Sequence, residues 1–169
     1  MRITRRQLVA AAAAVPVAGA LGAGAVGWSW WDRPIGEGLT GLAEDEYAFV
    51  QAVAEAWMPP GGEPALSGSE ANVGGFLDGV VSAMDDAPAR ELRLLLQALD
   101  DLPVLTHGSR FRHLSLDART ETLRGWLHAD QWLLRNAILA VLVLVAEAYT
   151  MHPTLVAMIR PWTRCGFGP

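Results

Sequence analysis

The sequence from about Asp130 to Thr150 predicts one long helix, and this helix strongly limits the fold. Its centre, from Ala137 to Ala146, is apolar at every position. This central run is too short to cross a bilayer, which takes roughly 20 apolar residues. A helix that is apolar on all sides is typical of the interior of a helical protein. We therefore expect this helix to be central and enclosed by the other helices of the domain.

The other apolar residues recur at helical spacing, and no long stretch alternates with the period of two that a strand requires. The sequence therefore predicts an all-α fold: a single small bundle of five to six helices around the central apolar helix. Besides the long helix, helices are predicted from Leu42 to Trp57, from a capping box at Ser67–Glu70 onward, from near Pro88 to near Pro103, from Ser115 to Leu127 and from Pro153 to Ile159.

The N-terminal segment has the pattern of a twin-arginine export signal. The pair Arg5-Arg6 directly precedes an uncharged apolar run from Leu8 to Trp31. We expect residues 1–31 to be this signal, residues 32–41 to be a Gly- and Pro-rich linker, and residues 42–169 to be the helical domain. The twin-arginine route carries proteins that are already folded, so the signal predicts a periplasmic or otherwise exported protein that binds a cofactor or travels with a protein that does.

The signal is either removed or kept as a membrane anchor. Small residues at 18–20 and 23–25 suit a signal peptidase. The apolar run is also long enough to span a bilayer, and it ends in Trp28, Trp30 and Trp31, a residue type enriched at membrane interfaces. We favour removal; if the segment is retained, it holds the protein at the inner membrane.

Charge and cysteine content exclude several classes of function. The chain has 18 acidic residues, 13 basic residues, all of them arginine, and a net charge of −5, which argues against a nucleic-acid partner. The acidic residues gather in the first part of the domain, whereas residues 102–169 carry seven arginines and only four acidic residues. Cys165 is the only cysteine, so an internal disulfide, a c-type haem attachment and a cysteine-held iron–sulfur cluster are excluded.

No group of residues in the sequence points to catalysis or to metal binding. The adjacent carboxylates Asp85-Asp86 and Asp100-Asp101 point apart on a helix, so we interpret them as caps and solvated charge. The Glu-x-x-His motif of a di-iron bundle does not occur. A haem held by a histidine and by Met151 or Met158 stays open, but no cofactor or metal site is assigned to this chain. The histidines are His107, His113, His128 and His152.

Aromatic residues in the arginine-rich half suggest a protein interface instead. Trp, Tyr and Arg are the residues enriched at the energetic centres of interfaces. Any one of these residues can fill the core of a small bundle, but we do not expect all of the aromatic ones to do so. The candidate interface residues are Trp126, Trp132, Arg135, Tyr149 and Trp162.

Several short motifs follow one another in an order that resembles a known family. They are the start Thr4-Arg5-Arg6, the run from Leu42 to Glu46 that leads to Trp57-Met58-Pro59, the triplet Phe76-Leu77-Asp78, the run from Phe111 to Leu114 with Arg119 and Leu123 after it, Arg135, and the run from Ala148 to Pro153. In this order they resemble gluconate 2-dehydrogenase subunit 3, the small subunit of periplasmic flavoprotein dehydrogenases. The likeness covers most of Leu42 to Trp162. The sequence departs from the family pattern at Ala43, where a hydroxyl cap is usual, and at Arg160-Pro161-Trp162.

The resemblance implies an all-helical, non-catalytic small subunit. Such a subunit binds an FAD-dependent oxidoreductase of the glucose–methanol–choline type, helps it mature, and exports it through the twin-arginine pore on its own signal. FAD is then expected in the partner and not in this chain, and a cytochrome c subunit often completes the complex. The alternative hypothesis is a membrane-anchored helical module that itself binds a ligand or a redox cofactor.

Overall fold

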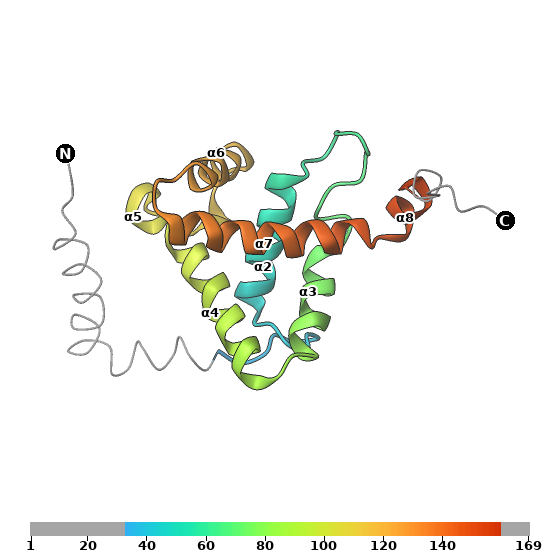
Figure 1. Ribbon diagram of the computed structural model, residues 1–169, viewed down its shortest axis with the longest axis horizontal. Coiled ribbons are helices and arrows are strands. Elements are labelled where there is room, and N and C mark those ends of the chain that lie inside the picture. The colour runs from blue at the N-terminus through green and yellow to red at the C-terminus, as the bar shows by residue number, and fades with distance from the viewer. Residues whose placement is uncertain (1–32, 160–169) are drawn as a thin grey trace. The chain divides into compact units, whose positions relative to one another are not determined.

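The computed structural model describes residues 33–159, and every regular element in that range is helical (Figure 1). The predicted all-α class is therefore confirmed. The predicted export signal lies outside the described residues. In chain order the elements are α2 (Glu44–Trp57), α3 (Val73–Ser82), α4 (Asp86–Asp101), α5 (Val104–His107), the 3₁₀ turn η1 (Phe111–His113), α6 (Leu116–Leu127), α7 (Trp132–Thr150) and α8 (Pro153–Ile159).

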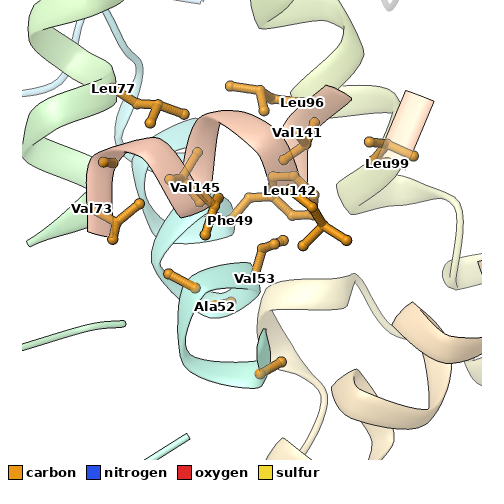
Figure 2. Close-up of a cluster of buried hydrophobic side chains, with 14 of the residues drawn as sticks. Phe49, Ala52, Val53, Val73, Leu77, Leu96, Leu99, Val141, Leu142 and Val145 are labelled. Atoms are coloured by element: carbon orange, nitrogen blue, oxygen red, sulfur yellow. The ribbon is translucent and has the colours of Figure 1, made fainter. Parts of the chain in front are cut away.

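Helix α2 lies at the centre of the helical domain. It packs against α3, α4, α6, α7 and η1. Its residues Phe49, Val50, Val53 and Ala54 are completely buried, because apolar side chains are spread widely around this helix and neighbours cover it on several sides. Figure 2 shows side chains of α2 meeting those of α7, α3 and α4 in one continuous core.

The long apolar helix α7 is not the enclosed helix that the sequence predicted. One side of it, with Ile138, Val141, Leu142 and Val145, is buried against the core. Figure 2 shows the last three of these side chains in the core. Only 28% of the most apolar 18-residue stretch of this helix is buried. No other element in residues 33–159 covers its outer side. An apolar sequence indicates that a helix is poorly suited to contact with water, but it does not indicate which element covers the helix. The enclosed position belongs to α2 instead.

Helix α7 is also long and apolar enough to cross a membrane, judged by length and composition alone. It is the one helix within residues 33–159 with this property. A helix that contributes to the core of a soluble protein passes the same test, and α7 packs against α2, α3, α4 and α6. The packing therefore identifies α7 as a core helix with one uncovered side.

The predicted capping box at Ser67–Glu70 forms, but it does not begin a long helix. The carboxylate of Glu70 accepts hydrogen bonds from the backbone N–H of Ser67 at 2.8 Å and from the Ser67 hydroxyl at 2.7 Å. Helix α3 begins only at Val73, after Asn72, which adopts a left-handed conformation with φ of 51° and accepts a hydrogen bond from the N–H of Gly75. The box therefore closes a separate turn, and the predicted start of the second helix is too early.

Asp78 of α3 fastens the segment that leads into α2. Its carboxylate accepts hydrogen bonds from the backbone N–H groups of Thr40 at 2.9 Å, Gly41 at 2.9 Å and Leu42 at 2.8 Å, and from the Thr40 hydroxyl at 2.7 Å. Gly41 lies so close to α3 that a Cβ atom there would stand 2.6 Å from the backbone nitrogen of Ser82. This arrangement, the Asp78 clamp, joins residues 40–42, which lead into α2, to helix α3.

The clamp makes part of the stability depend on pH. Burial raises the pKa of the Asp78 carboxyl, but the hydrogen bonds from residues 40–42, that of Gly41 foremost, outweigh burial and leave this pKa below its usual 3.8. A carboxyl with a lowered folded-state pKa stabilises the fold above its unfolded-state pKa, and the contribution is lost as the pH falls through the folded-state pKa. The clamp is therefore fully effective at neutral pH.

We expect Asp78→Asn to lower the free energy of unfolding by about 1–3 kcal/mol at neutral pH, because an amide turns a donor toward N–H groups that need an acceptor. The difference between wild type and variant should be smaller at strongly acidic pH, because the contribution of the carboxylate is lost as the pH falls through its lowered folded-state pKa. Urea unfolding of both proteins at the two pH values measures this. An equal difference at both values would contradict the assigned role of the carboxylate.

Glu46 ties α2 to α4 from a fully buried position. Its Oε2 atom accepts hydrogen bonds from the backbone N–H of Ala43 and from Nε of Arg93, each at 2.8 Å. The side-chain amide of Gln97 donates to the other oxygen. Ala43 has no side-chain acceptor, so the start of α2 depends on Glu46 rather than on a hydroxyl cap.

Candidate partner interface

The groups that could perform chemistry are dispersed in the described part of the chain. Within residues 33–159, no cluster of three His, Cys, Asp or Glu side chains is arranged to hold a metal ion. The histidines lie in separate turns and helix ends. His128 is the residue after the last turn of α6, and the ring of His152 accepts a hydrogen bond from the N–H of Thr154 at the start of α8.

Asp100 is buried, so its interpretation as solvated charge is wrong. The backbone N–H of Arg112 donates to it at 3.0 Å, and the guanidinium of Arg112 forms an ion pair with it. Burial raises the pKa of Asp100 above its usual 3.8, although the hydrogen bond and the charge of Arg112 act in the opposite direction. Asp101 instead pairs with Arg110 at 2.8 Å. The two neighbouring carboxylates thus connect α4 to the segment around η1 and do not form an acid–base pair.

Trp126, the first candidate interface residue, belongs to the core. It is 8% exposed and stacks on Phe111 with ring centroids 5.4 Å apart. Phe111 in turn meets Phe49 of α2 edge to face at 5.5 Å. The three rings form a row that joins α6 to α2 through η1. Trp126 therefore cannot present its ring to a partner while this row is intact.

Tyr149 is also a core residue. Its hydroxyl donates a hydrogen bond to the backbone oxygen of Leu66, which connects the end of α7 to the loop before α3. Burial raises the pKa of Tyr149, and the negative charge of Glu70 adds to that rise. The hydroxyl therefore stays protonated at neutral pH and remains a donor.

Trp132 differs from the other aromatic candidates because 68% of it is exposed, at the first residue of α7. Arg135 is half-buried, and its guanidinium donates to the backbone oxygen of Ala129 at 3.1 Å across the turn between α6 and α7. Trp162, Arg5 and Arg6 lie outside the described residues. Of the candidate interface residues, Trp132 is thus the one that the structure places on the surface.

The sequence analysis overlooked exposed aliphatic residues on the same helix. Leu133 is 73% exposed, Val143 is 62% exposed and Leu139 is 43% exposed. Met151 follows directly after α7, and Val156 and Met158 of α8 are exposed as well. Large contiguous apolar surfaces in soluble proteins mark sites of interaction. The signal for these residues was present in the sequence, because a run that is apolar on all sides has more apolar surface than one neighbouring core can cover.

Comparison with known proteins identifies the family. Neither a search of curated proteins nor a search of solved structures found a match. A scan of family models found one described as gluconate 2-dehydrogenase subunit 3, which matches residues 44–169. The match begins at the first residue of α2 and includes every helix described above. The chain therefore belongs to the gluconate 2-dehydrogenase subunit 3 family, whose name denotes an accessory subunit of a dehydrogenase complex.

Proposed function

We propose that this chain is a non-catalytic small subunit that binds a flavin-dependent dehydrogenase, helps it mature, and exports it by the twin-arginine route. The partner carries FAD and is of the glucose–methanol–choline type. A cytochrome c subunit completes the complex in this proposal. The protein acts in the periplasm, with membrane contact through residues 1–31 if that segment is retained.

The observation that carries the proposal is the uncovered apolar side of α7. A helix with Trp132, Leu133 and Val143 facing water needs a partner, because exposed apolar surface of this kind favours association. Membership of a dehydrogenase-subunit family supplies the class of that partner. The arginine pair Arg5-Arg6 supports export of a folded complex, since the route that reads it accepts folded proteins.

Co-expression with the dehydrogenase encoded beside this chain tests the function. With the full chain present, we expect flavin-loaded, active dehydrogenase in the periplasm. Without the chain, we expect the dehydrogenase to stay in the cytoplasm and to carry less flavin. A dehydrogenase that reaches the periplasm folded and active without this chain would overturn the proposal. An absorption spectrum of the purified chain tests the alternative, because a bound redox cofactor would colour it.

Replacing Arg5 and Arg6 together by Lys should leave both this chain and its partner in the cytoplasm. Lysine keeps the positive charge but not the planar guanidinium, and the export receptor reads the arginine pair. Dehydrogenase activity in the periplasmic fraction measures the effect, and total activity in whole cells controls for expression. Unchanged periplasmic activity would contradict the twin-arginine assignment and indicate that residues 1–31 are an ordinary secretory signal or a membrane anchor.

A further inference from the structure

One side of α7 presents a continuous exposed surface that is free of charge. Its residues recur at spacings of three and four, so they lie above one another on the helix. At 3.6 residues per turn they occupy roughly a third of the circumference, opposite the buried positions. This surface, called the α7 face below, consists of Trp132, Leu133, Asn136, Leu139, Ala140 and Val143.

The α7 face rests on a rigid support. The opposite side of the helix places Val141, Leu142 and Val145 against Phe49 and Val53 of α2, as Figure 2 shows. The backbone beneath the exposed residues is therefore held by the core and not by a loop. A surface that is ordered before binding loses little conformational entropy when a partner docks, which favours tight association.

The charges around the α7 face favour a protein over a membrane. Asp130 is exposed just before the helix, and Glu147 is exposed one turn after Val143. Helices that lie on membranes carry Lys and Arg beside their apolar side, because bilayer surfaces are anionic. Arg135, the only basic residue of α7, is half-buried and donates to the backbone oxygen of Ala129. The exposed charges at both ends of the face therefore have the sign that an anionic bilayer repels.

We propose that the α7 face is the docking surface for the dehydrogenase subunit, and that the matching surface of that subunit has an apolar centre flanked by basic side chains opposite Asp130 and Glu147. This inference rests on the proposed function. Trp132 is the largest exposed side chain of the face and serves as its anchor, since Trp is among the residues that contribute most to interfaces. The amide nitrogen of Asn136 donates to the backbone oxygen of Trp132 at 2.7 Å, so its Oδ1 oxygen is the polar atom of the face that a donor on the partner would have to meet, which adds selectivity.

Val143→Glu tests the centre of the surface. The full chain is tagged, co-expressed with the dehydrogenase encoded beside it, and purified. We expect the Val143→Glu chain to retain at least ~10-fold less dehydrogenase than the wild-type chain. The matched control is Leu105→Glu on α5, which places the same charge at a residue that is 84% exposed and outside the α7 face. The control should retain as much dehydrogenase as wild type. Leu133→Glu is a second variant within the face, and circular dichroism verifies that each variant is folded.

Glu147→Arg tests the charged rim. The new arginine would face a basic group on the partner, so the variant should retain several-fold less dehydrogenase than wild type at low salt. This loss should diminish as salt is added, because salt screens the repulsion. Glu121→Arg on α6 is the matched control, because Glu121 is an exposed carboxylate on another helix. If the Glu147→Arg chain retains as much dehydrogenase as wild type, the inference that basic side chains of the partner lie opposite Glu147 is wrong.

The outcomes separate this inference from the proposed function. If the wild-type chain retains no dehydrogenase, the proposed function fails. If wild type retains it and both Val143→Glu and Leu133→Glu retain it equally well, the function stands and the docking surface is overturned. If Val143→Glu instead abolishes flotation of the chain with phosphatidylglycerol vesicles while dehydrogenase binding is unchanged, the α7 face is a membrane surface and the proposal is overturned.

Discussion

Trp126→Ala should unfold far more readily than wild type, with a loss of about 3–5 kcal/mol in the free energy of unfolding. The ring is buried and stacked on Phe111, so its removal leaves a cavity between α6 and η1. Trp132→Ala, six residues later, should change this free energy by no more than about 0.5 kcal/mol, because that ring faces water in the free chain. Chemical denaturation of the three proteins measures both values.

The same two variants should exchange their ranks when partner binding is measured. Trp132→Ala should cost ~2 kcal/mol or more of binding to the dehydrogenase if it anchors the α7 face. Trp126→Ala should bind at temperatures where it is folded, since its ring does not reach the surface. A Trp126→Ala protein with wild-type stability and lost binding would move the interface to α6 and contradict the present assignment.

Glu46→Ala should lower the free energy of unfolding by about 3 kcal/mol, because it removes the acceptor shared by the Ala43 N–H, Arg93 and Gln97 and leaves the Ala43 N–H and the Gln97 amide without that acceptor in the core. Glu44→Ala is the matched control in the same first turn. Glu44 is exposed, so its contribution is limited to a favourable interaction with the helix dipole, about 0.3–1 kcal/mol. Thermal unfolding of the two variants under identical conditions gives the comparison.

Equal losses in Glu46→Ala and Glu44→Ala would show that the first turn of α2 is stabilised mainly by its negative charge. A loss of stability confined to Glu46→Ala would show that α2 is stabilised mainly by the hydrogen bonds that link Glu46 to α4. Raising the salt concentration sharpens the distinction, because exposed charge is screened and the buried hydrogen bonds of Glu46 are not.

Much of the fold could be predicted because it depends on local patterns. Apolar spacing and helix stops located α2, α4, α6 and α7 closely, and Ser115 caps α6 as expected by accepting the N–H of Ala118. The start of α3 was missed because Ser67 and Glu70 satisfy each other within a turn that precedes the helix. The role of Glu46 was missed because an acid in a first turn looks the same in sequence whether or not an arginine from another helix reaches it.

The candidate interface was harder to predict from sequence, for a physical reason. Trp126 and Trp132 have similar neighbours in the chain, and which of them faces the core depends on the turn between α6 and α7. Tyr149 is buried because its hydroxyl finds the oxygen of Leu66, a residue far away in sequence. Exposure of an apolar helix is equally invisible, since the residues that cover its other side belong to elements whose positions the sequence does not specify.

The central position of α2 has a consequence for how the chain is made. Helix α2 leaves the ribosome early, but α7, which covers Phe49 and Val53, begins about 75 residues after α2 ends and so emerges much later. Until Val145 has been translated, these side chains lack one of their neighbours. A nascent chain arrested before Trp132 would therefore hold an incomplete core and would bind chaperones or be degraded. The core of the domain is thus completed only near the end of its synthesis.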